Sequence, residues 1–279
     1  MASSLSPSQI DQFRQDGYLS PLQVLTPNET TRFREEYDAY EATVSDELAA
    51  LASRDRYQYL AETHLYLPWV YELSTHPRVL DLVESILGED LLLWDSRWFT
   101  KRPGEGTFVS WHQDGTYWAL DPPMACTAWI ALSDSTAANG CMSVIPGSHR
   151  GDSLPHRDTF EEDNALARGQ EIAVEVDEAD AVSLVLKPGE MSIHNISIVH
   201  GSKPNTSDTD RIGLAARFIT PQTKHNVADP LAMLVRGEDR FGHFDLIEPP
   251  VNTEPKLVSD RRDELVARIY SNYSSVEEK

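Results

Sequence analysis

Cysteine is scarce in this chain of 279 residues, since Cys126 and Cys141 are the only two. Their spacing is neither a CxxC pair nor the framework of a disulfide-rich secreted domain, so we expect a reducing, cytoplasmic setting. The sequence also lacks any apolar run long enough to span a bilayer, and it lacks a basic segment followed by a short apolar one. We therefore expect no insertion into a membrane.

Positive charge is also in short supply, because 24 Lys and Arg residues face 45 Asp and Glu residues, giving a formal net charge of −21. A chain this acidic repels phosphate backbones and anionic lipid surfaces. The balance excludes a nucleic-acid partner and points to a small-molecule substrate. It leaves a small anionic substrate open, because cations that line a pocket act locally.

The chain is 40% hydrophobic, which is enough for one large core, and we predict a single domain over residues 1–279. Residues 1–90 carry helix signals. Ser6 and Thr26 are N-cap residues, each followed by a proline and then by Gln or Glu at the third helical position. Apolar residues at steps of three and four predict one helix from Thr26 to Leu51 and another over residues 77–88. We expect these helices to buttress a sheet.

Beyond residue 90 the pattern changes to short β-branched or aromatic runs separated by Pro, Gly and Asn turns. The predicted strands cover residues 91–100, 109–114, 126–132, 142–145, 172–176, 182–186, 191–194, 198–200 and 212–219. Many short strands of this kind are typical of a sandwich or barrel, so the fold is predicted to be mainly β with flanking helices. Residues 91–220 would form the β core, with a polar surface insertion at 152–169 as a candidate lid. Residues 221–279 would add a C-terminal loop and helix.

The most informative motif is the stretch Trp-His-Gln-Asp-Gly-Thr at residues 111–116. If His112 and Asp114 lie on one strand, alternation points both side chains to the same face. His200 supplies a second imidazole, and two imidazoles with one carboxylate form the facial triad of non-heme iron oxygenases. The alternative is that His112 is a core histidine and Asp114 a turn former. The ligand set alone would also bind other divalent ions.

Several ordered motifs now match a family. They are the pair His112-x-Asp114, then His200, then Arg211 eleven positions later, together with the runs at 139–149 and 200–205. From about Gly17 to about Phe244 the chain resembles the phytanoyl-CoA dioxygenase family. The resemblance implies a double-stranded β-helix core of jelly-roll or cupin type. It also implies the cofactor Fe(II), the co-substrate 2-oxoglutarate, and O2.

Arg211 is the residue that we expect to hold the far carboxylate of 2-oxoglutarate, because a guanidinium forms two parallel charge-assisted hydrogen bonds with a carboxylate. On its strand, Arg211, Gly213, Ala215 and Arg217 share one face, and the two small residues would leave room for a ligand. The alternative is a surface arginine near an acidic loop. The resemblance adds Ser202 as a second donor and Trp129 as a pocket wall, and Thr127 shares the face of Trp129.

The substrate contacts are less defined by the sequence. His194 and Asn195 precede the metal-binding motif, and each could equally be a core residue. Tyr57 and Tyr117 belong to an aromatic group that could line a cavity or simply pack. Arg236, Asp239 and His243 lie in a glycine-containing loop that could shape a site for a polar or anionic molecule, although a solvated loop fits as well.

The resemblance implies an enzyme that hydroxylates an unactivated C–H bond of a small metabolite and releases succinate and CO2. Phosphonates, amino-acid-like compounds and secondary metabolites are the candidate substrates. Asp114 favours hydroxylation over halogenation, because halogenating relatives replace this carboxylate with a small residue. Desaturation or ring closure by the same chemistry stays open. So do a non-enzymatic, cupin-like metal sensor and a metal-dependent isomerase or hydrolase. The sequence predicts no oligomeric state.

Overall fold

A computed structural model describes residues 4–227 and 229–277. Both predicted capping boxes are confirmed: Ser6 and Thr26 accept hydrogen bonds from the third backbone amide of their helices, and Gln9 and Glu29 bond back to the cap. The α-helices are α1 Pro7–Asp16, α2 Pro27–Thr43, α3 Ser45–Ala49, α4 Ser53–Tyr59, α5 Pro68–Ser74, α6 Pro77–Leu87 and α7 Pro255–Glu277. Short 3-10 turns are η1 Thr63–Leu65, η2 Asp114–Thr116, η3 Ser148–Arg150 and η4 Glu178–Asp180.

The prediction of one helix from Thr26 to Leu51 is wrong, because the helix breaks at Val44. The hydroxyl groups on either side of the break bond to the backbone: Thr43 donates to the carbonyl of Tyr40, and Ser45 donates to the carbonyl of Ala42. Such local bonds compete with the helical ladder, and β-branched residues propagate helices poorly. The apolar stripe nevertheless stays buried across the break.

Two antiparallel sheets form the β core. The larger has the order β1-β10-β5-β12-β2-β14-β15, where only the last pair is parallel, and the smaller has the order β3-β11-β6-β9. Their strands are β1 Tyr18–Gln23, β2 Leu91–Lys101, β3 Val109–His112, β5 Ala125–Ala131, β6 Ser143–Val144, β9 Val182–Ser183, β10 Glu190–Asn195, β11 His200–Ser202, β12 Arg211–Ile219, β14 Leu231–Arg236 and β15 Asp245–Leu246. Two small ribbons pair β4 Leu120–Asp121 with β13 Lys224–His225, and β7 His156–Asp158 with β8 Gln170–Ile172.

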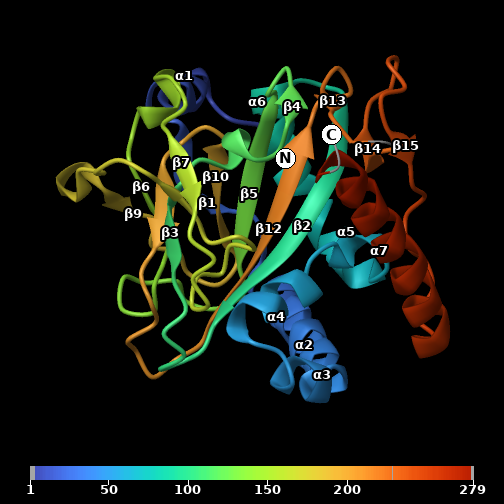
Figure 1. The fold of residues 1–279 in the computed structure, drawn as a ribbon. Helices are drawn as coiled ribbons and strands as arrows, with labels where there is room; N and C mark the ends of the chain where they lie inside the picture. Colours follow the sequence, from blue (N-terminus) through green and yellow to red (C-terminus); the bar gives the residue numbers. More distant parts are fainter. Residues whose placement is uncertain (1–3, 228, 278–279) are drawn as a thin grey trace.

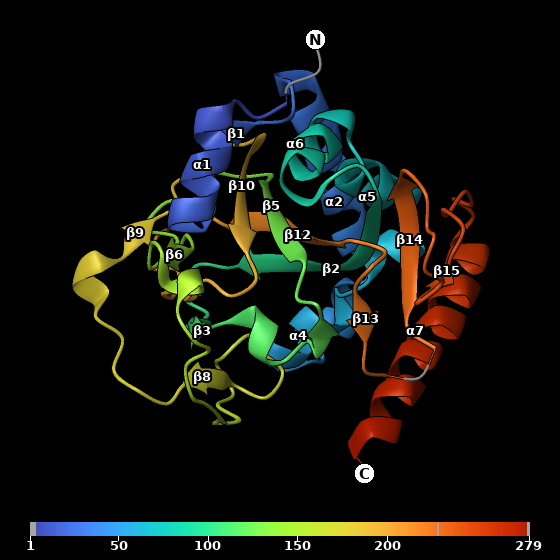
Figure 2. The same cartoon turned by 90° about the horizontal axis from the view of Figure 1, so that it is seen from above.

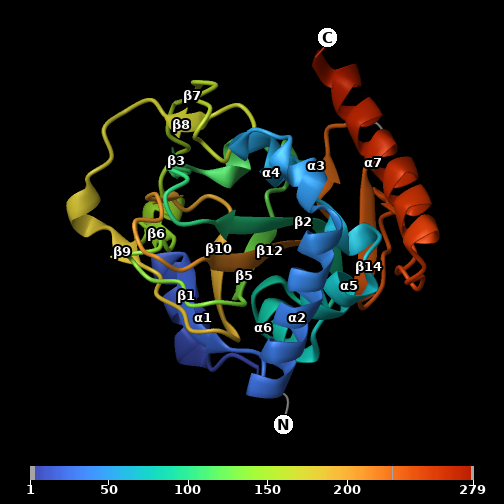
Figure 3. The ribbon, with the colours of Figure 1, turned by 90° about the horizontal axis from the view of Figure 1, so that it is seen from below.

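The sheets face each other, and the helices cover the outside of the larger one (Figures 1 and 2). Seen from below, α2, α5 and α6 lie on one side of β12 and β5, with β3 and β6 on the other (Figure 3). This arrangement is the predicted mainly β, double-stranded β-helix architecture. It creates two environments for the larger sheet, a helix-covered outer face and an inner face that looks toward the smaller sheet.

Strand β12 shows how the sequence encodes these two faces. Its alternate apolar residues join the main hydrophobic core beneath the helices; they are Ile212, Leu214, Ala216 and Phe218. The intervening positions point to the inner face, where Arg211, Ala215 and Arg217 line a cavity. The predicted division of this strand is therefore confirmed, and it places two arginines inside the barrel.

The segment predicted as a surface insertion at 152–169 lies against the smaller sheet. Strands β7 and β8 form a hairpin, and the chain between them bonds to β3 through the Phe108 and Ala165 backbones and through the Asn164 amide, which donates to Ser110. The strand predicted at 172–176 is displaced to 170–172 by this pairing. Leu166 from the segment reaches the inner cavity, so the segment forms part of its wall.

The described residues include no helix that is both long and apolar enough to cross a membrane. Cys126 and Cys141 are both buried and carry free thiols.

Buried histidines outside the cavity make stability sensitive to acid. His64 has no exposed surface, its Nδ1 lies 2.8 Å from Ser96 Oγ, and burial lowers its pKa to about 4. Between pH 6.5 and 4 the unfolded chain binds a proton at His64 that the folded chain does not. The free energy of unfolding therefore decreases as the pH is lowered. From pH 7.5 to 5, we expect His64 to account for about 2 kcal/mol of lost unfolding free energy. Urea unfolding should show a smaller pH-dependent loss in His64→Gln; an equal loss would contradict the assignment.

Candidate metal centre and co-substrate pocket

Three predicted ligands converge inside the barrel. The available ligand atoms of His112, Asp114 and His200 all lie within 4.8 Å of one another, and all three side chains are buried. His112 Nε2 is 3.4 Å from Asp114 Oδ1, and His200 Nε2 is 4.0 Å from Asp114 Oδ2. Adjacent donors on one metal ion lie about 3 Å apart for bond lengths near 2.1 Å. A small inward shift would therefore bring these atoms onto one ion.

The surroundings prepare the three side chains to act as ligands. The Nδ1 atoms of His112 and His200 lie 2.9 and 3.0 Å from the carbonyl oxygens of Ser110 and Ile198, so Nδ1 donates and Nε2 keeps its lone pair. Burial holds the pKa of His200 well below its usual value, so the ring stays neutral. For Asp114, burial alone would raise the pKa, but His112, His200 and Arg217 hold it well below the usual range. The donor set fits a divalent ion such as Fe(II).

The triad forms where β3 ends. Strand β3 ends at His112, Gln113 keeps an extended backbone (φ −123°, ψ 117°), and Asp114 begins the 3-10 turn η2. The Gln113 side chain donates to the Ser197 carbonyl and accepts from the Leu154 amide. Register brings His200 directly opposite His112. The extended residue between His112 and Asp114 and the pairing of β11 with β3 bring the three side chains together.

Arg211 lies at one end of the same cavity with 2% of its surface exposed. Its Nη1 donates to the Gly140 carbonyl, its guanidinium carbon is 5.4 Å from the Trp129 ring centre, and its Nε has no hydrogen-bond partner in the described chain. The predicted room beside Gly213 is filled by Trp129, because a Cβ there would lie 2.2 Å from the indole ring. Gly213 therefore seats the indole beside Arg211.

Ser202 lines the cavity near Arg211 and is held by a residue that sequence reasoning missed, Lys101. The Lys101 Nζ is 2.6 Å from Ser202 Oγ and also donates to the carbonyls of Ser202 and Lys203. Burial and the charge of Arg211 lower the pKa of Lys101 to about 6. The Arg211 guanidinium and the Ser202 hydroxyl, which Lys101 positions, thus meet at this end, and the pair suits a carboxylate. Strand alternation in the sequence could have revealed Lys101, since Lys101 and Phe99 lie on the same face of β2.

The other end of the cavity holds Thr127, His194 and Arg217. Thr127 and His194 were predicted to reach the site, whereas Arg217 was placed on the correct strand face but given no role. Arg217 forms an ion pair with Asp95, and its guanidinium carbon lies 4.8 Å from the Trp118 ring centre. His194 packs 5.0 Å from His200, measured between ring centres. The space enclosed between the two ends is about 40 Å³.

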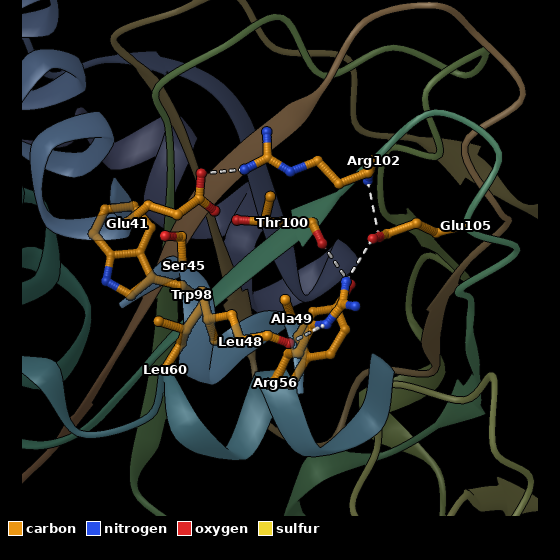
Figure 4. A pocket seen from close by; sticks show the side chains of 11 residues that line it. Glu41, Ser45, Leu48, Ala49, Arg56, Leu60, Trp98, Thr100, Arg102 and Glu105 are labelled. Atoms are coloured by element: carbon orange, nitrogen blue, oxygen red, sulfur yellow. Dashed lines mark hydrogen bonds and ion pairs between the residues drawn. The ribbon is translucent and has the colours of Figure 1, made fainter. Parts of the chain in front are cut away.

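Tyr57 lines a different cavity, of about 290 Å³, on the outer face of β2. Its ring lies 5.7 Å from Phe99, which faces the metal cavity, and its hydroxyl donates to the Thr100 carbonyl. The arginines of this outer cavity are already paired, Arg102 with Glu41 and Arg56 with Glu105 (Figure 4). Arg102 also pairs with Asp210. Its charged groups are therefore satisfied internally, and we assign no ligand to it.

The remaining predicted substrate residues do not line the metal cavity. Asn195 accepts a hydrogen bond from the Ser197 amide and so shapes the turn between β10 and β11. Tyr117 packs edge-on against His156, with 5.3 Å between the ring centres.

The loop after β14 also lies away from the ligands. Arg236 pairs with Asp81 and Glu84 on α6, and Asp239 accepts hydrogen bonds from backbone amides of its own loop. His243 packs against Phe241 at 5.7 Å between ring centres. Arg236 is in register with the start of β2, whereas Arg211 is in register with its end. The pairing with β2 therefore separates this loop from the Arg211 end of the cavity.

Comparison with known proteins agrees with this geometry. The phytanoyl-CoA dioxygenase family model matches residues 13–213. A probable alpha-ketoglutarate-dependent hypophosphite dioxygenase from Stutzerimonas stutzeri is 31% identical over 57% of this chain and 57% of its own length. The chain thus spans about half the length of the first curated relatives it matches.

Two solved structures cover nearly the whole chain. The apo form of the non-heme monooxygenase ThoJ is 34% identical with a TM-score of 0.82, over 97% of this chain and 99% of its own. CytC3 with Fe(II) and alpha-ketoglutarate is 25% identical with a TM-score of 0.66, over 88% of this chain and 94% of its own. With the family model matching most of the chain and the triad in place, the chain belongs to the phytanoyl-CoA dioxygenase family.

Proposed function

We propose that the protein is an Fe(II)- and 2-oxoglutarate-dependent dioxygenase that hydroxylates a C–H bond of a small polar metabolite. One observation carries the proposal: a buried two-histidine, one-carboxylate site shares a cavity with a buried arginine at its far end. A purely structural metal site needs neither an open face nor an arginine. When bound, iron and the keto acid supply oxidation of an unactivated C–H bond by O2, with succinate and CO2 as coproducts.

The chain's own residues would hold and orient these groups. His112, Asp114 and His200 would hold the metal. Arg211 and Ser202 would donate to the far carboxylate of the keto acid, and Trp129 would pack along it. Burial of all these side chains excludes water and strengthens each electrostatic contact.

The hydroxylation outcome is supported by Asp114, which occupies a ligand position that a halide would need. Desaturation and ring closure use the same site and depend on how the substrate is placed. The relative named for hypophosphite supports a small polar substrate.

An anaerobic titration tests the proposal. Fe(II) and 2-oxoglutarate added to the apo-protein should produce a visible metal-to-ligand charge-transfer band. Arg211→Ala should raise the 2-oxoglutarate concentration at half-saturation by about tenfold or more, because a buried charge-assisted bond is lost. On admission of O2, succinate should form faster with an accepted substrate, and hypophosphite and short alkylphosphonates are the first to try.

The controls separate an oxygenase from the alternatives. Tight Fe(II) binding without the band would overturn the proposal and favour a sensing or hydrolytic metal site. Turnover of any substrate without O2 and without 2-oxoglutarate would do the same in favour of an isomerase or hydrolase. A product that gains an oxygen atom would support hydroxylation over desaturation.

A further inference from the structure

Three buried polar side chains form a row across the inner face of the larger sheet, at the end of the cavity away from Arg211. His194 on β10 is in register with Thr127 on β5, which is in register with Arg217 on β12. Because the three strands are neighbours (Figures 1 and 2), residues in register point to the same side. All three line the metal cavity. We call them the His194–Thr127–Arg217 row.

Each member of the row has a polar atom without a hydrogen-bond partner among the described residues. These atoms are His194 Nδ1, Thr127 Oγ1 and Arg217 Nε. The side chains are nevertheless buried, with exposed fractions of 2%, 2% and 7%. A buried polar atom normally finds a partner, because leaving it unpaired costs free energy. Three such atoms, in side chains that line one cavity, indicate that a ligand bound there would supply the missing hydrogen-bond partners.

The three groups share the ability to donate a hydrogen bond. The Arg217 guanidinium is always charged and offers an Nε–H, and the Thr127 hydroxyl can rotate toward an acceptor. The His194 imidazole can donate an N–H from a ring nitrogen. Three converging donors suit a ligand group that has several acceptor oxygens.

The charges around Arg217 leave its Nε available to a ligand. Arg217 pairs with Asp95, its register partner on β2, and Asp95 also faces Arg97. Asp114 also interacts with Arg217, so the two guanidinium groups face two carboxylates. The preference for a group with several acceptor oxygens therefore comes from the three donors themselves.

The keto acid does not need this row, if the proposed function is correct. Its far carboxylate would bond to Arg211, six residues before Arg217 and about 20 Å away along β12, and its other end would bind the metal. We propose that the His194–Thr127–Arg217 row binds a carboxylate or phosphonate group of the primary substrate and so holds the substrate beside the metal. The substrate class of this enzyme would then be small oxyanions.

The test uses acetate and methylphosphonate as probes on the anaerobic complex with Fe(II) and 2-oxoglutarate. Each probe should perturb the visible band in a saturable way, whereas dimethyl sulfone, a neutral molecule of similar size, should not. Arg217→Gln should weaken probe binding about tenfold or more, because it removes the charge and the Nε donor. Arg236→Gln is the matched control and should leave probe binding unchanged, since Arg236 pairs with α6.

The outcomes distinguish a failure of the dioxygenase proposal from a failure of the oxyanion-subsite proposal. No band in the unaltered protein would refute the proposed dioxygenase. A normal band that neither anion perturbs would refute the oxyanion subsite alone. A band that requires far more 2-oxoglutarate in Arg217→Gln would assign the row to the keto acid instead, which also overturns the substrate assignment.

A second variant covers the case in which Arg217→Gln leaves Asp95 unpaired and does not fold. Thr127→Val keeps the shape of the side chain and every charge but removes the hydroxyl donor. It should weaken probe binding several-fold while leaving the band and its 2-oxoglutarate dependence intact. Unchanged probe affinity in this variant would contradict the subsite.

Discussion

Replacing Asp114 with alanine should weaken binding of a divalent ion more than about 100-fold, because changes in residues that merely support a metal ligand already cost about 10- to 100-fold. The variant removes the single carboxylate of the triad and leaves two neutral imidazoles, which attract a cation less strongly. The direct measurement is a calorimetric titration of the apo-protein with Mn(II), which needs neither O2 nor substrate. Succinate formation should fall to background in parallel.

His194→Gln is the informative control for this experiment. His194 lies 5.0 Å from His200 between ring centres, and sequence spacing alone could make it a rival ligand. The variant should keep its Mn(II) affinity within a few-fold, since His194 does not belong to the cluster of converging ligand atoms. A large loss in His194→Gln together with little change in Asp114→Ala would refute the assigned triad.

The second large effect is expected from the smallest substitution, Gly213→Ala. A Cβ at this position would lie 2.2 Å from two carbons of the Trp129 ring, so the indole must move. Trp129 packs against Arg211 and lines the end of the cavity that we propose binds 2-oxoglutarate. We expect 2-oxoglutarate to bind about tenfold or more weakly and stability to fall by about 1–3 kcal/mol, the usual cost of overpacking. The charge-transfer band and urea unfolding measure the two effects.

The double variant Gly213→Ala with Trp129→Phe provides the matching control. A phenyl ring is smaller than an indole, so it should accommodate the added methyl group. The stability lost in Gly213→Ala should therefore be recovered in part relative to Trp129→Phe alone. If the two changes are simply additive, the close contact between residues 213 and 129 is not the cause.

Much of the site was predictable because its information is local or carried by motifs. The capping residues Ser6 and Thr26 start their helices through contacts within one turn. The alternation on β12 placed Arg211 and Arg217 on one face, since side-chain direction in a strand depends only on position. The pair His112-x-Asp114 followed by His200 predicted three side chains that converge, with an extended backbone at Gln113 between the first two.

Where the predicted substrate residues lie depends on the order of the strands, which no local pattern encodes. Tyr57 comes from α4, lines the outer cavity and packs with Val109 and Phe99, and no periodicity in residues 53–59 encodes these contacts. Arg236 was predicted as a candidate contact for an anion because glycine and aromatic residues follow it in the sequence. Its strand, however, pairs with the start of β2, where α6 supplies carboxylates.

The sequence by itself predicted the convergence of His112, Asp114 and His200, the arginine at the end of the cavity and the division of β12 into an apolar and a polar face, because each depends on motifs or on neighbouring positions. Only the tertiary structure decided that Lys101 holds Ser202 and that His194, Thr127 and Arg217 share one row. These contacts join strands far apart in the chain. They exist because β10, β5 and β12 are adjacent in the sheet, and adjacency of strands results from the packing of the whole molecule.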